Sequence, residues 1–223
     1  MSEFERICKL IDPKTNRNGL ESFIAHLDCF SEYSGTNRWE RWLQYELLFL
    51  LSKGNHKTLR DPKFEKQYAY DKRYKLPAAK NGKSKAQIDF LYGLGGDDRD
   101  LYHAVELKMS NSLKGVLRSG LQDLLRIQAI KEKWAFRSVT LFAVFVDDKR
   151  IAPEYRNIRD ELENSLSFFR IIELNKKYSV LLFGWSAQPR SVCKDAYIKW
   201  VNAADAIYQK HGINVWKSDV SRS

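Results

Sequence analysis

Cysteine and histidine are scarce in this chain of 223 residues, and their scarcity excludes several kinds of site. The three cysteines, Cys8, Cys29 and Cys193, lie far apart and form no C-x-x-C pair, so the sequence indicates neither a zinc site nor a disulfide framework. The four histidines are scattered and show no metal-binding spacing. We therefore expect a protein of the reducing cytoplasm.

Long apolar stretches are absent as well. Apolar runs such as residues 47–51 are far too short to span a bilayer, and residues 1–6 contain no apolar signal region. The sequence therefore predicts a soluble, intracellular protein with no membrane partner.

Positive charge, in contrast, is plentiful. Lysine and arginine number 38 against 28 aspartates and glutamates, which gives a formal net charge of +10 and a pI near 9.4. This excess favours an anionic partner, most simply nucleic acid, although charge alone also fits a membrane surface or general solubility. With 43% hydrophobic residues the chain can bury one sizeable core, so we expect a single domain over residues 1–223.

Two segments in the middle of the chain alternate with the two-residue period of a β-strand. In residues 86–92 the alternation separates Asp89 from the apolar face, although aspartate is depleted in strands. In residues 101–109 it puts Glu106 and Lys108 beside each other on one face. The residues between the segments are glycine-rich and polar and lead into a strand, which predicts a hairpin turn and not a phosphate-binding loop.

The predicted hairpin brings Asp89 alongside Glu106 and Lys108. Carboxylates suit Mg²⁺, which proteins hold with one or two such groups together with waters and phosphate oxygens. The lysine can orient an attacking water or offset developing negative charge. The pattern therefore predicts metal-assisted hydrolysis of a phosphodiester, with a surface salt-bridge cluster as the structural alternative.

These residues resemble a known signature. Ile88-Asp89, a hairpin-length gap and then Glu106-Leu107-Lys108 look like the D…(D/E)-x-K motif of the PD-(D/E)xK, or restriction-endonuclease-like, nuclease superfamily. The chain departs from the family pattern at Ile88, where a proline often precedes the aspartate. The resemblance implies that Asp89 and Glu106 hold Mg²⁺, that the Leu107 backbone carbonyl is a further ligand, and that Lys108 serves the water.

The same resemblance implies an α/β fold with a central mixed β-sheet flanked by helices. The restriction-endonuclease-like core, which runs helix, three strands, helix, strand, would lie at about residues 38–146. An N-terminal helical cover would occupy residues 1–37, and a C-terminal extension of strands and a helix would occupy residues 147–223.

A glutamate in the first core helix is a further candidate. The helix expected over residues 38–52 is apolar almost all round, yet it carries Glu46 one turn from Trp42 and Leu50. A buried carboxylate is costly unless it meets a metal, a cation or hydrogen-bond donors. The resemblance implies a glutamate here that reaches the metal, and the alternative is a glutamate at the helix margin paired with a surface lysine or arginine.

The remaining segments complete the α/β pattern. Residues 139–146 form a nearly unbroken apolar run, which is typical of a strand buried on both faces. Ser110 begins a cap-rich stretch that predicts the start of a helix. We expect helices over residues 4–11, 20–33, 38–52, 110–133, 153–165 and 195–210, and strands over 64–75, 86–92, 101–109, 139–146, 168–174 and 178–185.

Basic residues flank the predicted site on two segments. A lysine-rich loop precedes Asp89, and a stripe with four-residue spacing lies on the helix after Lys108. Phosphate contact is the functional interpretation and a solvated surface is the alternative. The candidates for nucleic-acid contact are Lys80, Lys83 and Lys85 in the loop, and Lys114, Arg118, Gln122 and Arg126 on the helix.

The resemblance implies a Mg²⁺-dependent endonuclease that acts on DNA, with Mn²⁺ able to replace Mg²⁺. Defence against foreign DNA, phage biology, mobile elements and repair all use this fold, and fold alone does not fix function. Target selection would come from loops, the C-terminal region, a homodimer or a partner protein. Two alternatives stay open: a catalytically vestigial nucleic-acid-binding protein on the same fold, and an RNA-cleaving or structure-selective nuclease.

Overall fold

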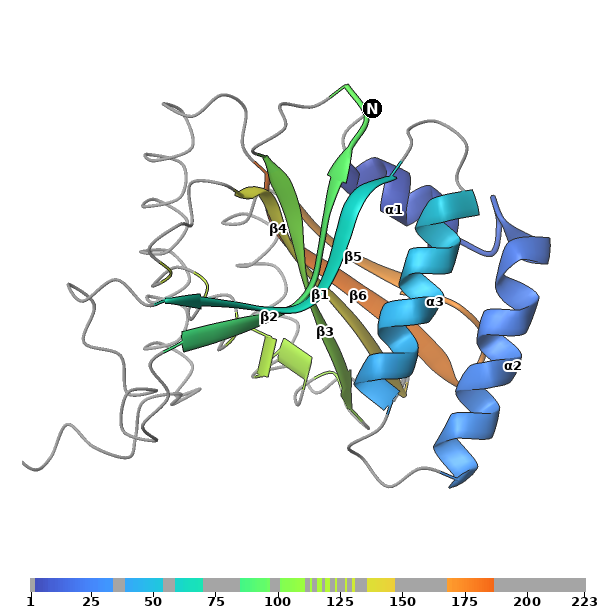
Figure 1. Cartoon of the computed structure of the whole chain (residues 1–223). Helices are drawn as coiled ribbons and strands as arrows, with labels where there is room; N and C mark the ends of the chain where they lie inside the picture. The colour runs from blue at the N-terminus through green and yellow to red at the C-terminus, as the bar shows by residue number, and fades with distance from the viewer. Residues whose placement is uncertain are drawn as a thin grey trace, which may run out of the picture.

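In the part of the chain that it describes, the computed structural model contains three bounded helices, six strands and separate helical residues between 113 and 127 (Figure 1). It describes residues 3–33, 39–53, 59–69, 85–96, 101–110, 136–146 and 168–186, together with residues 113, 116, 117, 119, 120, 123, 127 and 130. The helices are α1 (Glu3–Ile11), α2 (Arg17–Tyr33) and α3 (Trp39–Lys53), and the strands are β1 (Leu59–Ala69), β2 (Lys85–Leu94), β3 (Tyr102–Ser110), β4 (Phe136–Val146), β5 (Phe168–Glu173) and β6 (Tyr178–Ser186).

The six strands form one mixed sheet in the order β1-β2-β3-β4-β6-β5. The first three strands are antiparallel neighbours, so the predicted hairpin of β2 and β3 is confirmed. Strand β4 runs parallel to β3, and β6 and β5 continue the sheet in antiparallel fashion. A mixed sheet with helices is an α/β architecture, as the sequence predicts.

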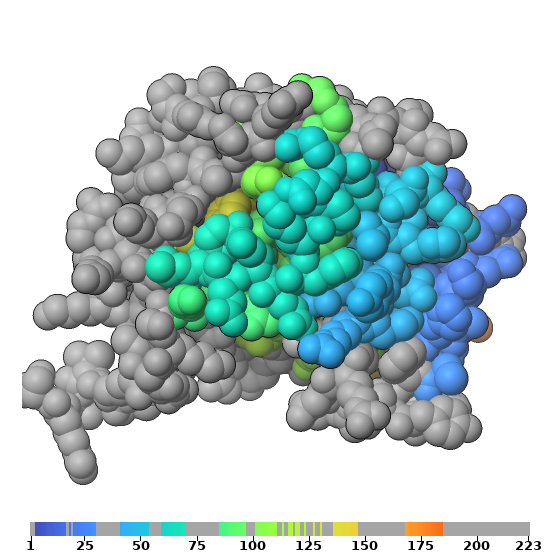
Figure 2. Space-filling view, viewed as in Figure 1, coloured from blue at the N-terminus to red at the C-terminus, as the bar shows by residue number. Residues whose placement is uncertain are grey.

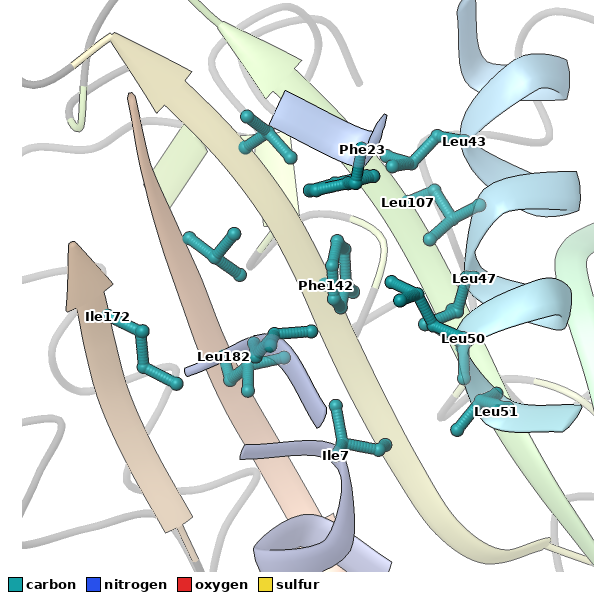
Figure 3. Packing of buried hydrophobic residues seen from close by; sticks show 14 of the residues in the cluster. Ile7, Phe23, Leu43, Leu47, Leu50, Leu51, Leu107, Phe142, Ile172 and Leu182 are labelled. Carbon is teal, nitrogen blue, oxygen red and sulfur yellow. The ribbon is translucent and has the colours of Figure 1, made fainter. Parts of the chain in front are cut away.

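All three helices lie on one face of the sheet, as Figure 1 shows. Alternation along the strands directs Leu107 of β3, Phe142 of β4 and Leu182 of β6 to this face, and all three are fully buried. They pack against leucines of α3 such as Leu43 and Leu47 (Figure 3). Helices α1 and α2 contribute Ile7 and Phe23 to the same buried cluster.

Helix α1 is tied to distant parts of the chain. Arg6 is buried and donates hydrogen bonds to Glu3 at 2.6 and 2.8 Å and to the Leu51 carbonyl at 3.2 Å. The Tyr92 hydroxyl donates to the same Glu3 carboxylate at 2.5 Å, and burial raises the pKa of Tyr92 well above its ordinary value. The Phe4 ring stacks on Phe168 of β5, with 4.2 Å between ring centroids.

The opposite face of the sheet is covered by the residues described between 113 and 130. Leu113, Val116, Leu117 and Ile127 are helical and buried there, within the helix expected over residues 110–133. Gly120 lies so close to the sheet that a methyl group in its place would collide with the buried Leu141 side chain of β4. These residues belong to the connection between β3 and β4, which as parallel neighbours need a crossover that leaves the sheet.

Strand β1 differs from the prediction because it begins at Leu59, five residues before the expected start at Phe64. It passes through Pro62, which an edge strand tolerates because one side of its backbone faces no neighbour. The register also shifts between Arg60 and Lys63, which breaks the alternation that a sequence pattern can detect. Figure 2 shows β1 beside α3 on one side of the molecule, where the rings of Tyr45 and Phe64 lie 5.3 Å apart.

Other boundaries also differ. Ser110 is the last residue of β3 and does not begin a helix, Ile130 forms a bridge and is not helical, and β4 begins at Phe136. Helices α1 to α3 and strands β5 and β6 lie within a few residues of their predicted bounds. Residues 70–84, which include the end of the strand expected over 64–75 and most of the expected lysine-rich loop, lie outside the described residues. The helices expected at 153–165 and 195–210 also lie outside them. No helix in the described part of the chain has the length and apolar character needed to cross a membrane.

Candidate functional site

The site lies where strands β2 and β3 separate. Pairing between them ends at Phe90 and Val105, while β2 continues alongside β1 as far as Lys85 (Figure 1). Asp89 is the first residue of β2 beyond this last pair. Its carboxylate oxygen Oδ2 accepts a hydrogen bond from the Leu107 backbone N–H at 2.8 Å. The aspartate side chain therefore satisfies a backbone donor of β3 at the point where the ladder ends.

Glu106 lies next to Asp89 on the face opposite to the helices. Its neighbour Leu107 enters the hydrophobic core, so strand alternation directs Glu106 to the other side of the sheet. Only 4% of Glu106 is exposed, and its carboxyl group is hydrogen-bonded to that of Asp89. Burial raises the pKa of Glu106 well above its ordinary value, and the charges of Asp89 and Asp123 raise it further. Glu106 therefore holds its proton more tightly than an exposed glutamate does.

The pKa of Asp89 is also raised, and burial is the main cause. Three interactions act in the opposite direction: the charge of Lys108, the hydrogen bond from Leu107 and the hydrogen bond from Glu106. The two carboxyl groups thus experience different environments, since several neighbours lower the pKa of Asp89 while Asp89 and Asp123 raise that of Glu106. Such a pair is ready to accept a cation but is costly without one.

Lys108 completes the predicted cluster and pairs with Asp123, a residue that the predicted cluster does not include. Its ammonium nitrogen Nζ lies 2.7 Å from Oδ2 of Asp123, which belongs to the helical residues on the second face. Burial would lower the pKa of Lys108, but the carboxylates of Asp123, Glu106 and Asp89 outweigh this effect, so the pKa lies above its ordinary value. Lys108 is therefore charged in the folded protein.

Asp123 did have a signal in the sequence. Val116, Gly120, Asp123 and Ile127 follow one another at three- and four-residue spacing, so Asp123 falls on the apolar face of the predicted helix. A carboxylate in that position needs a cation or hydrogen-bond donors, in the same way as Glu46 in α3. The structure supplies Lys108 as that cation.

Glu46 makes its contacts within the helical layer. One carboxylate oxygen, Oε1, lies 2.8 Å from Nδ1 of His26 on α2 and accepts the Trp42 indole N–H at 3.1 Å. The partners of Glu46 are thus a histidine and a tryptophan, and it is Asp89, Glu106 and Asp123 whose carboxylates the structure brings together around Lys108. Within the described ranges, no group of three or more histidine, cysteine, aspartate or glutamate side chains could hold a metal ion.

The predicted phosphate contacts are only partly visible. Lys85 is exposed at the start of β2, where strand alternation puts it on the same face as Asp89. The other candidates, Lys80, Lys83, Lys114, Arg118, Gln122 and Arg126, lie outside the described residues.

Comparison of the chain with protein-family models, with curated proteins and with solved structures finds no match. What the site can do chemically is therefore inferred from its own residues. Two adjacent carboxyl groups provide hard oxygen donors of the kind that Mg²⁺ prefers, and Mg²⁺ needs only one or two of them from the protein. A charged lysine beside them can stabilise negative charge that develops on a phosphate.

Proposed function

We propose that the protein is a Mg²⁺-dependent nuclease that hydrolyses phosphodiester bonds of DNA. The observation that carries the proposal is the hydrogen-bonded carboxyl pair of Asp89 and Glu106, which lies beside the charged Lys108 where two strands separate. These are the three residues that resemble the D…(D/E)-x-K motif. The hairpin brings these residues close together, because Asp89 and Glu106 are 17 positions apart in the sequence.

The energetics of the pair favour a functional site over a structural salt-bridge cluster. A structural cluster pairs opposite charges, commonly at the surface, where the pKa values of its carboxylates fall. Here the cluster is buried, and the pKa values of both Asp89 and Glu106 are raised. Buried groups with pKa values perturbed in this direction are enriched at catalytic and metal-binding sites.

The order of the elements supports a restriction-endonuclease-like core as part of the proposal. Helix α3 is followed by the antiparallel strands β1, β2 and β3, by the helical residues between 113 and 127, and by β4. This is the succession of helix, three strands, helix and strand that the resemblance implies. In this arrangement the candidate motif occupies β2 and β3, next to each other in the centre of the core.

Each residue of the cluster has a role in the proposed reaction. Asp89 and Glu106 would hold Mg²⁺ with the Leu107 carbonyl as a further ligand, and the hydrogen bond from the Leu107 N–H fixes the Asp89 carboxylate in place. Lys108 would orient the attacking water or offset charge on the phosphate. The bound ion would supply Lewis acidity and a more acidic water, and Mn²⁺ would replace it. Glu46 has no role in holding the ion in this proposal, because it lies in the helical layer on the other face of the sheet, in contact with His26 and Trp42.

The test is cleavage of linear, circular, single-stranded and branched DNA, and of RNA, each with Mg²⁺ and with excess chelator. We expect Mg²⁺-dependent cleavage of DNA, and a loss of about 10²-fold or more in Glu106→Gln, because this change removes a metal-binding charge without changing side-chain volume. The matched control is Glu173→Gln, an exposed glutamate on β5 at the far edge of the sheet.

Three results would contradict the proposal in different ways. Full activity in Glu106→Gln, or activity that survives the chelator, would refute the metal-dependent mechanism. Tight binding of nucleic acid without cleavage of any substrate would favour the vestigial binding protein. Cleavage of RNA alone would keep the chemistry and change the substrate.

A further inference from the structure

Asp123 and Lys108 form a close ion pair in the candidate site, and no part of the D…(D/E)-x-K motif accounts for it. The two residues come from different layers, since Lys108 projects from β3 and Asp123 belongs to the helical residues that cover the sheet. Their charged atoms are 2.7 Å apart, and the side chains are only 17% and 10% exposed. A pair so withdrawn from water is held in a defined geometry far more firmly than a surface ion pair.

We propose that Asp123 is a positioning residue for Lys108, which it holds in the place from which the ammonium acts in hydrolysis. This inference rests on the proposed nuclease function. It adds one side chain from outside the motif to the three motif residues. Asp123 acts through Lys108 and is not itself a ligand of the metal.

The need for such a residue follows from the lysine side chain. Lysine has a flexible four-carbon stem and a point charge without preferred direction, so its position must be imposed by its surroundings. Asp89 and Glu106 also attract the ammonium, and without a competing partner Lys108 would pair with them and neutralise the charge that a metal requires. The carboxylate of Asp123 provides that competing partner from the helical residues on the second face of the sheet.

Two other roles of Asp123 make different predictions. If the ion pair only fastens the helical residues to the sheet, its loss affects stability but not the rate of the folded enzyme. If Asp123 were a metal ligand, its loss would raise the Mg²⁺ concentration needed for half-maximal activity, and excess Mg²⁺ would restore the rate. A positioning role affects the catalytic rate at saturating metal and substrate.

The experiment compares Asp123→Asn and Asp123→Glu with the wild type for kcat, for KM with a labelled DNA substrate and for the half-saturating Mg²⁺ concentration. We expect Asp123→Asn to lower kcat by about 10- to 100-fold, the usual effect of losing a residue that orients a catalytic group, while both concentrations stay within about threefold. Asp123→Glu, which keeps the charge, should recover part of the rate, and it provides a second variant if Asp123→Asn fails to fold.

The matched control is Asp28→Asn on α2, which removes the ion pair between Asp28 and Lys177, 3.0 Å long and on the helical side of the sheet. This control should leave kcat unchanged. A separate measurement needs no activity: the unfolding equilibrium constants of Asp123→Asn, Lys108→Met and the double variant should depart from multiplicative behaviour by about tenfold or more if the pair forms.

Four outcomes would overturn the inference. A kcat within about twofold of the wild type in Asp123→Asn would leave Asp123 as a structural tether. Restoration of that rate by excess Mg²⁺ would make it a ligand, and an equal loss in Asp28→Asn would indicate general destabilisation. A wild-type protein that cleaves no nucleic acid would refute the proposed function, and the role of Asp123 with it, even where the unfolding measurements show the pair.

Discussion

Asp89 makes a structural hydrogen bond whose contribution to stability can be measured separately from its proposed role in metal binding. Its carboxylate accepts the Leu107 N–H at 2.8 Å where the ladder between β2 and β3 ends. The relevant comparison is between Asp89→Asn and Asp89→Ala. Both variants lose the charge, and therefore both escape the cost of burying it, but only asparagine keeps an oxygen that can accept the Leu107 hydrogen bond.

The difference between the two variants isolates this one bond. A buried backbone donor that loses its acceptor costs about 1 to 3 kcal/mol. We therefore expect Asp89→Ala to be less stable than Asp89→Asn by about that amount. In a domain of this size, 1 kcal/mol corresponds to a change in Tm of roughly 2 to 4 °C. Neither variant should support cleavage, since both lack the ligand charge.

Urea unfolding of both variants, followed by tryptophan fluorescence and circular dichroism with chelator present, measures the difference. Equal m-values would show that the change lies in stability and not in the extent of unfolding. If Asp89→Ala is as stable as Asp89→Asn, the hydrogen bond to Leu107 contributes nothing. The description of Asp89 as the residue that closes the end of the ladder would then be wrong.

Two further predictions concern stability near the site. Burial and neighbouring charges raise the pKa of Glu106 in the folded chain. As the pH rises above the ordinary glutamate range, the unfolded chain therefore loses a proton that the folded chain keeps. The free energy of unfolding should fall over this range and level off above the folded pKa. Glu106→Gln should reduce that fall in metal-free urea titrations at about pH 5 and about pH 8, and an unchanged pH profile would contradict the raised pKa. Gly120→Ala should lower stability by about 1 to 3 kcal/mol, because the new methyl group meets the buried Leu141. A helical glycine replaced by alanine ordinarily gains about 1 kcal/mol, so a higher Tm in this variant would refute the close contact.

The sequence predicted those parts of the fold whose patterns are local. Alternation in β3 put Glu106 and Lys108 on one face, and the apolar run before Val146 predicted a central strand. Strand β1 was placed too late because Pro62 and its charged neighbours are typical of a loop, and only the pairing with β2 makes the segment a strand. An edge strand is defined by its hydrogen bonds to a single neighbouring strand, which its own sequence does not show.

The candidate site was likewise predictable only where its residues lie close together in the sequence. Asp89, Glu106 and Lys108 lie within one hairpin, so a short-range pattern was sufficient to bring them together. The partner of Lys108 lies beyond the hairpin on another layer, and Glu46 meets His26 from a different helix. Contacts between layers depend on how the elements pack, which the period of a single element does not encode.

The anchorage of α1 bears on the order in which the chain acquires its structure. Phe4 stacks on Phe168, and Glu3 receives the hydroxyl of Tyr92, so the first helix completes its contacts only after most of the sequence exists. On a ribosome that adds about 5 to 20 residues per second, the partner strand β5 emerges many seconds after α1. During that interval α1 can pack against α3, but Phe4 has no ring to stack on, and contacts this distant in sequence are slow to form. Helix α1 is made well before β5 and is therefore fully secured only after β5 has joined the sheet.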